Sequence, residues 1–262
     1  MKKNKKIWLV VGLLVIVIVF VILNIPSIKK PFGQTETGKI SLEVPLEGSE
    51  VYLDGKGYQS TSVKNQTLDI PDVAANTPHT VLVAKNGYWP WGKTVTVEAG
   101  RTLDLTAFNG PQAEVTTDVA AGSKDYAAAT AALATNTGTP SKATMIVSKD
   151  GSVGIWVEGN ALMAEWKGED DPDQFFCVEG LCDKDTQVFK GTAPITHLAF
   201  YKNRDDIVLF SSGGAIYAIE LNRNGTQNFQ PVFMGTNPTF APSSDGTVLF
   251  VKDGGKIQEV LL

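Results

Sequence analysis

Residue types that carry most enzyme chemistry are sparse in this sequence. It contains two histidines, His79 and His197, and no motif connects either of them to a nucleophile or a metal ligand. Signatures of a serine nucleophile, a zinc protease, a phosphate-binding loop and a dinucleotide fold are absent from it. An isolated histidine more often has a structural or solvated role than a catalytic one. We therefore predict no catalytic residue, no cofactor, and a protein that is not an enzyme.

Acidic residues and the two cysteines lie close together in the second half of the chain. Residues 169–173 read Glu-Asp-Asp-Pro-Asp, but the alternating acids and the sixth-position glycine of an EF-hand loop are missing. We expect a solvated loop there and no metal site. Cys177 and Cys182 follow. In an exported protein they are expected to form a disulfide, which closes only a small ring and fixes the shape of the loop.

A run of aromatic residues is the candidate binding surface. Tyr88, Trp89 and Trp91 surround Pro90 at a turn between two expected strands. Two indole rings beside one proline are not expected to point together into a small core, and exposed aromatic rings often stack on a sugar ring or a partner's proline. A structural alternative is open: one Trp would cover the edge of the domain, and the other would touch the membrane or a neighbouring domain.

An apolar segment near the N-terminus indicates membrane attachment. Residues 7–23 carry no charged or polar side chain. A helix rises about 1.5 Å per residue, so with two more residues this segment spans a hydrocarbon core, and we predict a transmembrane anchor over residues 7–25. Lysines are more numerous before the segment than after it: Lys2, Lys3, Lys5 and Lys6 against Lys29 and Lys30. The positive-inside rule predicts a single-pass plasma-membrane protein with residues 1–6 in the cytoplasm and an extracytoplasmic body.

Two further observations narrow the class of protein. A cleaved signal peptide is the alternative to an anchor, but no small-residue cleavage site follows Leu23, and no cysteine is placed there to carry a lipid. The chain has a formal net charge of −5, and the exported part is more acidic still because the first six residues hold four lysines. A body without a basic patch is not expected to bind nucleic acid.

Beyond a polar tether predicted over residues 26–38, the hydropathy pattern changes to a period of two. From residue 39 to 108 apolar and polar residues alternate in short runs, separated by turn residues such as Asp54–Gly57 and Asn86–Gly87. Short strands at this spacing predict a small β-sandwich.

Two motifs in this stretch resemble the PEGA domain family. Residues 45–55, Pro-Leu-Glu-Gly-Ser-Glu-Val-Tyr-Leu-Asp-Gly, resemble the run that names the family, with Leu46 inserted and Ser49 in place of the alanine. Residues 81–88 resemble the family's strand that ends in Gly-Tyr. The resemblance implies a small extracytoplasmic β-sandwich with a non-catalytic, protein- or surface-associated role, and it transfers no catalytic residue.

Residues 109–142 differ in composition and are dominated by Ala and Thr. The stretch 125–134 could form a short helix, but its apolar face is too thin for independent stability. We predict that the whole range is an interdomain linker.

The remaining residues, 143–262, contain an internal repeat. Each unit reads strand, Asp-containing turn, strand, Gly-containing hairpin, strand, and the hairpins lie at Gly159, Gly213–Gly214 and Gly254–Gly255. This order resembles the blades of TolB-like and WD-repeat β-propellers, although no Trp-Asp signature is present. The resemblance implies a propeller-like module of about three blades, with the residues around 169–182 inserted between the first two.

An array of three blades is expected to have open edges, because propellers usually close with at least four blades. Such edges would allow a homo-oligomer, closure by another protein or by part of residues 111–142, or a place within a longer propeller. The predicted fold class is thus all-β with one N-terminal transmembrane helix: a small β-sandwich followed by propeller-like antiparallel blades.

These observations favour a non-enzymatic function. We expect a membrane-anchored envelope or surface protein that presents β binding modules to a glycan, a cell-wall component or a protein. Two alternatives are open: a propeller-type enzyme that acts on peptide or sugar, and a sensory or assembly subunit of a larger envelope complex.

Overall fold

The computed structural model of the chain describes residues 36–112, 116–136, 138–169, 176–178, 181–202, 204–223 and 225–262. These residues form short strands in small, mostly antiparallel sheets, together with one α-helix, which confirms the predicted all-β class of the body. The predicted anchor over residues 7–25 lies outside the described residues. Within the described ranges no helix is long and apolar enough to cross a membrane.

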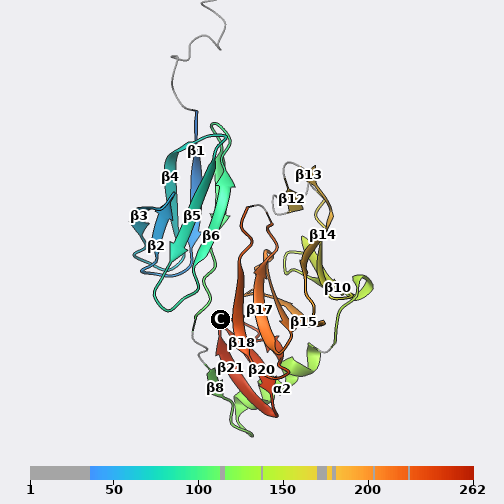
Figure 1. The fold of residues 1–262 in the computed structure, drawn as a ribbon. Coiled ribbons are helices and arrows are strands. Elements are labelled where there is room, and N and C mark those ends of the chain that lie inside the picture. Colours follow the sequence, from blue (N-terminus) through green and yellow to red (C-terminus); the bar gives the residue numbers. More distant parts are fainter. Residues whose placement is uncertain are drawn as a thin grey trace, which may run out of the picture.

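Two sheets form the N-terminal sandwich, drawn in blue to green in Figure 1. One sheet has the strand order β4-β1-β7 and the other has the order β3-β2-β5-β6. β1 pairs antiparallel with β4 and parallel with β7. The strands are β1 Thr37–Val44, β2 Glu50–Leu53, β3 Lys56–Ser60, β4 Gln66–Ala74, β5 Pro78–Ala84, β6 Trp91–Thr96 and β7 Thr102–Thr106.

The period-two pattern sets which side chains enter the sandwich core. Ile40, Leu42 and Val44 of β1 are all 0% exposed, as alternate residues of a strand with one buried face should be. The two-residue turn between β2 and β3 places Asp54 at φ 51° and Gly55 at φ 74°. Both positive values match the turn type that a tight hairpin prefers.

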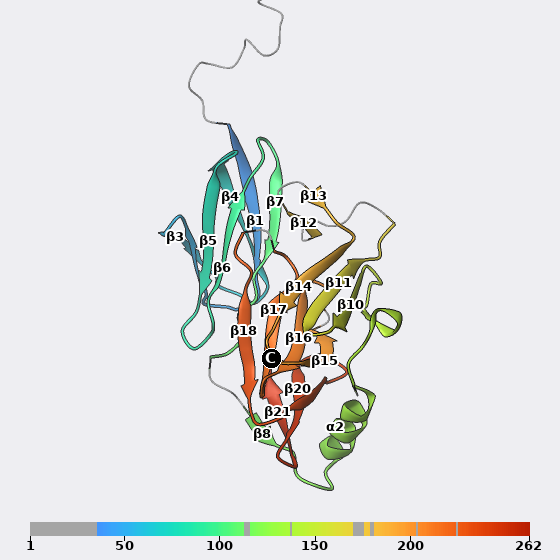
Figure 2. The same ribbon diagram turned by 45° about the vertical axis from the view of Figure 1, so that its right-hand side comes forward.

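Three four-stranded antiparallel sheets follow, with the orders β14-β11-β10-β9, β15-β16-β17-β18 and β19-β20-β21-β8 (Figure 2). A separate hairpin is formed by β12 Cys177–Val178 and β13 Leu181–Cys182. The other strands are β8 Thr116–Asp118, β9 Ile146–Val147, β10 Val153–Glu158, β11 Ala161–Trp166, β14 Asp185–Lys190, β15 Ile195–Phe200, β16 Ile207–Ser212, β17 Ala215–Glu220, β18 Phe229–Met234, β19 Thr239–Pro242, β20 Val248–Asp253 and β21 Lys256–Leu261.

The sequence repeat corresponds to a repeated turn in the first and last of these sheets. Ser148 donates its hydroxyl to Asp150 Oδ1 at 2.5 Å and accepts the N–H of Val153 at 3.0 Å. Ser243 makes the same pair of bonds in the last sheet. In the middle sheet Tyr201 takes the place of this serine, since its N–H pairs across the turn in the same way. The middle unit therefore departs from the repeat at one turn.

The range 109–142, which we predicted to be a linker, contains two packed elements. β8 pairs antiparallel with β21 and supplies the fourth strand of the last sheet. Helix α2, Lys124–Thr135, lies against β19 and β20. The range is therefore structurally part of the last sheet, and the edge of β21 is paired within the chain.

Tertiary contacts explain why α2 forms despite its thin apolar face. Ser123 caps the helix by accepting the N–H of Tyr126 at 3.0 Å. Ala129 is 0% exposed and packs with Phe250 and Ile257 on the outer face of the last sheet. Short helices gain most of their stability from such packing, which composition alone does not reveal.

The residues after α2 cover the first sheet in a similar way. Pro140 accepts the N–H of Val157 in β10 at 2.9 Å, and the 3₁₀ helix η2, Lys142–Thr144, follows. Lys142 Nζ lies 5.0 Å from the ring centre of Trp156, which is only 2% exposed. One continuous segment thus covers the outer faces of the last and the first sheet.

The hydrophobic core is not divided between the sandwich and the sheets. One cluster of buried residues extends from Trp91 and Phe108 of the sandwich into the second and third sheets, where it includes Ile216 and Leu262. A second cluster fills the space between the first two sheets. The sandwich therefore packs on the module through the same core that holds the module's own sheets together.

Candidate functional site

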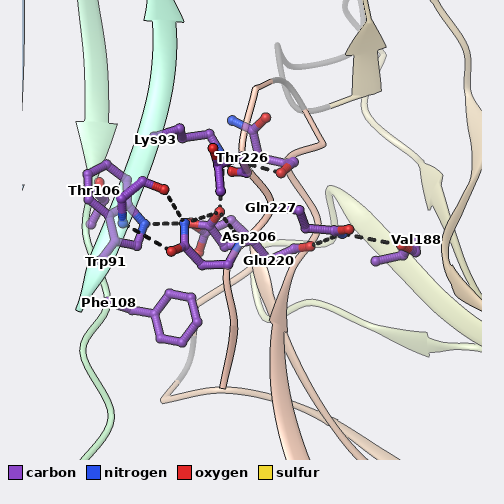
Figure 3. A network of polar contacts seen from close by, with 12 residues as sticks. Trp91, Lys93, Thr106, Phe108, Val188, Asp206, Glu220, Thr226 and Gln227 are labelled. Carbon is purple, nitrogen blue, oxygen red and sulfur yellow. Dashed lines mark hydrogen bonds and ion pairs between the residues drawn. The ribbon is translucent and has the colours of Figure 1, made fainter. Parts of the chain in front are cut away.

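Trp91, one of the three aromatic residues of the predicted binding surface, is not on the surface. It is 1% exposed, and its Nε1–H donates to Glu220 Oε1 of β17 at 2.5 Å (Figure 3). The prediction was wrong for this residue, because a neighbouring domain supplies the core and the acceptor that a small sandwich lacks. The structural alternative, in which one Trp touches a neighbouring domain, describes Trp91 correctly.

Tyr88 and Trp89 are both partly exposed. Lys85 Nζ lies 5.2 Å from the ring centre of Tyr88, and the main-chain N–H of Trp89 donates to the carbonyl of Gly110 at 2.8 Å. Tyr88 is on the wall of a cleft described below. The structure therefore separates the three aromatic residues into one core residue and two at the surface.

A buried ion pair joins the sandwich to the middle sheet. Lys93 Nζ lies 2.9 Å from Glu220 Oε2, and the two side chains are 2% and 4% exposed. Lys93 also donates to the carbonyls of Asn222 and Thr226, at 3.2 and 3.3 Å. Figure 3 shows Trp91 and Lys93 pointing from the sandwich toward Glu220. All three protons of the ammonium group have an acceptor, which is the condition for a buried charge to be tolerated.

Two amide side chains at β18 bind the main chain of the sandwich. Asn228 Oδ1 accepts the N–H of Gly92 at 3.1 Å, and its Nδ2 donates to the carbonyl of the same residue at 3.0 Å. Gln230 accepts the N–H of Gly110 at 2.8 Å and donates to the carbonyl of Phe108 at 3.2 Å. Each amide replaces the donor and acceptor that a neighbouring strand would offer.

Arg204 makes a third contact of this kind from the irregular turn of the middle sheet. Its guanidinium donates to the carbonyl of Ala107 at 2.8 Å and to that of Thr106 at 3.1 Å. Asp206 holds the guanidinium at 2.5 Å. The turn that departs from the repeat is thus the one that reaches the sandwich.

Residues 37–109 match the model of the PEGA domain family. This range is the sandwich described above, so the resemblance noted in the sequence is confirmed for this part of the chain. No curated protein matches the chain. On the sandwich side, the contacts of the ion pair, of Arg204 and of Asn228 are made by residues inside the PEGA domain. These residues lie in β6 or at positions 106–107.

A cleft of about 1990 Å³ opens beside this interface. The PEGA domain contributes the edge strands β6 and β7 and Tyr88, and the module contributes Tyr201, Lys202 and Asp245. Tyr201 packs against Phe108 with ring centres 6.0 Å apart, and burial raises its pKa to about 12. The pKa of Lys202 is lowered, by partial burial first and then by the charges of Arg204 and Lys64.

One group of side chains in the PEGA domain has the distances of a catalytic triad. Asp54 Oδ2 lies 2.8 Å from His79 Nδ1, and Thr77 Oγ1 lies 3.1 Å from His79 Nε2. However, His79 Nε2 also lies 2.8 Å from the carbonyl oxygen of Ala74, which can only accept. In this geometry the ring donates through both nitrogens, and the hydrogen bond to Asp54 raises the pKa of His79. The Thr77 hydroxyl donates to the carbonyl of Ala74, so its proton does not point at the ring as a nucleophile's would.

The second histidine lies apart from that group. His197 is in β15 at φ 51°, its ring centre is 6.3 Å from that of Phe240, and burial lowers its pKa. Its Nδ1 is buried and has no hydrogen-bond partner among the described residues. Across the same described ranges, no three His, Cys, Asp or Glu side chains gather in a way that could hold a metal ion.

The remaining predicted site residues lie at the inserted loop. Glu169 is exposed, and the acids from 170 to 173 lie outside the described residues. The register of β12 and β13 places Cys177 directly opposite Cys182. This backbone pairing is compatible with the predicted disulfide, which stays a prediction.

Sequence reasoning missed the residues of the module that hold the PEGA domain: Arg204, Glu220, Asn228 and Gln230. A signal was present for Glu220. It follows Ile216 and Ala218 at a spacing of two in β17, and both of those residues belong to the core cluster shared with the sandwich. A carboxylate on the buried face of an apolar strand requires a partner from another element.

Proposed function

We propose that the protein is a non-enzymatic, membrane-anchored envelope or surface protein. In this proposal residues 7–25 hold it in the plasma membrane with residues 1–6 in the cytoplasm, and the extracytoplasmic body presents β modules to a glycan, a cell-wall component or a protein. The PEGA match supports the extracytoplasmic, non-catalytic role.

The module is proposed to be propeller-like. Three sheets of four antiparallel strands, each built around the same hairpin, support this interpretation. β8 and α2 belong to the segment between the PEGA domain and the first sheet, and they complete and cover the last sheet. This packing favours closure within the chain over pairing with a second copy through open edges.

The observation that carries the proposal is the cleft shared by the two parts. Lys93, Glu220 and the main-chain contacts of Asn228 and Arg204 hold the PEGA domain in one orientation on the module. The two walls of the cleft are therefore fixed relative to each other before any partner arrives, and preorganisation of this kind lowers the entropic cost of binding.

Site-specific photo-crosslinking in intact cells tests this proposal. A photoreactive amino acid is placed in the full chain at Lys64 or Arg101, both exposed on the cleft, and at Lys56 or Lys252, which are exposed elsewhere. We expect an adduct of defined mass from the two cleft positions and little adduct from the two controls. Equal yields from all four positions would contradict the proposal.

A further inference from the structure

The cleft runs along the edge of β7. Every residue from Arg101 to Thr106 lines it. Successive side chains of a strand point to opposite faces, so a cleft that touches all of them must follow the edge of the strand. β7 pairs with β1 on one side, and no described strand pairs with it on the other.

Two main-chain hydrogen bonds between β7 and β1 show which main-chain groups of β7 face the cleft. The N–H of Lys39 donates to the carbonyl of Arg101. At the other end, the N–H of Ala107 donates to the carbonyl of Glu43. In a parallel pair alternate residues bond to the same neighbour, so odd-numbered residues of this stretch face β1. The residues whose N–H and C=O turn outward are Thr102, Asp104 and Thr106.

Arg204 confirms this direction and marks where the free edge ends. Its guanidinium approaches from the module and donates to the carbonyl of Thr106, an outward residue. Among the described residues nothing bonds to the outward main-chain groups of Thr102 or Asp104. These two residues therefore hold the unpaired part of the edge, in direct continuation of the interface between the PEGA domain and the module.

The neighbouring edge strand, β6, is already covered by the module. Asn228 takes both main-chain groups of Gly92. The backbone at Gly225 lies so close that a Cβ there would be 1.9 Å from the carbonyl oxygen of Thr94. Of the two edges that border the cleft, β7 is thus the one left open to another strand.

The opposite edge of the same sheet is protected against pairing. β4 carries Pro71 at an outward position, and Asp72 follows at φ 55°. Tyr58 of β3 donates its hydroxyl to the outward carbonyl of Asp69 at 2.7 Å. Proline and local distortion are common ways to block an edge strand. β7 contains neither, although it is an edge strand of the same sheet.

We propose that the cleft binds an extended polypeptide segment of a partner protein, which adds as a strand to the outer edge of β7. This inference rests on the proposed function and names its partner class. Val95 and Leu103, both half-buried in the wall, would contact alternate apolar side chains of the segment. Exposed charges of both signs, such as Arg101 and Asp104, line the cleft. The main chain of β7, rather than net charge, therefore sets the class of ligand.

A peptide probe tests the proposal on the full chain in detergent micelles. Random linear peptides displayed on phage are selected against the chain, and the most enriched sequence is synthesised with a fluorophore for anisotropy measurements. N-methylation then removes peptide N–H groups one at a time. We expect methylation at alternate positions on one edge to weaken binding about tenfold, and methylation on the other edge to have little effect.

Variants of the protein give a second readout. Asp104→Pro removes an outward N–H without removing a bond to β1, so binding of the peptide should weaken about tenfold. Thr67→Pro is the matched control, because Thr67 is exposed at an outward position on β4 and does not itself line the cleft. It should leave binding unchanged. The methylation series uses the unaltered chain and stays informative if Asp104→Pro folds poorly.

Three results would overturn the inference. These are the absence of any enriched peptide, a binding peptide whose affinity shows no alternation on methylation, and a dimer of the full chain that Asp104→Pro dissociates. The last result would assign the edge to a second copy. In all three cases the unaltered chain would still form crosslinks from Lys64 and Arg101 in cells. Failure of this inference is therefore distinguishable from failure of the proposed function.

Discussion

Lys93 and Glu220 form an ion pair of 2.9 Å that is nearly inaccessible to solvent, although the residues belong to different parts of the chain. Lys93 lies on β6 of the PEGA domain, and Glu220 ends β17 of the middle sheet. A buried charge is costly to leave without a partner. The pair therefore makes the orientation of the PEGA domain on the module a condition of stability.

Loss of one charge of this pair should be more harmful than loss of both. Glu220→Gln leaves the ammonium of Lys93 buried without a counter-charge, and we expect the free energy of unfolding to fall by about 3–5 kcal/mol. Adding Lys93→Met should restore part of that loss, because it removes the buried ammonium that has lost its counter-charge. Urea unfolding of the full chain measures the free energy of unfolding of both variants.

The control is the exposed pair of Lys142 and Asp185. Asp185→Asn should leave stability nearly unchanged, because solvent screens such pairs. A double variant less stable than Glu220→Gln would contradict the account of the buried pair.

The hydrogen bond between His79 and Asp54 predicts that the protein loses stability as the pH rises above the unfolded-state pKa of histidine. The hydrogen bond to Asp54 raises the folded-state pKa of His79 above 6.5. The protonated ring is therefore favoured by folding, and its contribution is complete below about pH 6.5, the pKa of the unfolded chain. It is lost as the pH rises through the raised pKa of the folded state. Urea midpoints of the chain should fall over that range, and His79→Gln should remove this part of the dependence.

The pair of His79 and Asp54 also predicts that the protein loses stability as the pH falls into the acid range. His79 lowers the pKa of Asp54, so the contribution of the carboxylate is present above its unfolded pKa and is lost as the pH falls through the lowered value. Asp54→Asn should therefore flatten the acid limb. A pH profile identical in the two variants and the wild type would show that the pair contributes nothing to stability.

The packing of α2 predicts a difference between adjacent alanines. Ala129 is fully buried against the last sheet, whereas Ala128 is exposed. Ala129→Glu should lower the free energy of unfolding by more than about 2 kcal/mol, since it buries a charge, and should cause self-association by uncovering Phe250 and Ile257. Ala128→Glu should do neither. Sedimentation over a range of concentrations distinguishes the two variants. Equal behaviour of both would contradict the conclusion that α2 covers the outer face of the last sheet.

The cysteines give a prediction about compartment. Cys177 and Cys182 are paired by backbone register in β12 and β13. If the body is extracytoplasmic, they should be joined by a disulfide. Intact-mass analysis of the protein from cells should show two hydrogens fewer than the reduced chain. Two free thiols would argue that the body stays in a reducing compartment.

The strands were predictable because their pattern is local. Alternation of Ile40, Leu42 and Val44 identifies β1, and Asp-Gly at the end of β2 identifies its turn. The docking of the PEGA domain was not predictable in this way. Trp91 and Glu220 are 129 residues apart in sequence, and nothing near Trp91 shows that an acceptor will be supplied.

The segment that follows the PEGA domain was misjudged for a related reason. Its composition predicts a linker, and Ala129 becomes a core residue only because the face of β20 and β21 needs a cover. Besides the buried position of Glu220, a local sign of docking was the turn after β15, where Tyr201 and Arg204 replace the serine-based turn of the other two units.

The most direct test of the central claim, that the cleft receives its partner along β7, joins crosslinking in cells to the edge variant. The photoreactive residue is placed at Arg101 in the full chain that carries either Asp104→Pro or Thr67→Pro, and adducts are compared by mass. The account predicts a partner adduct that Thr67→Pro retains and Asp104→Pro loses. Adducts of equal yield in both variants, from a chain that is equally folded, would contradict it.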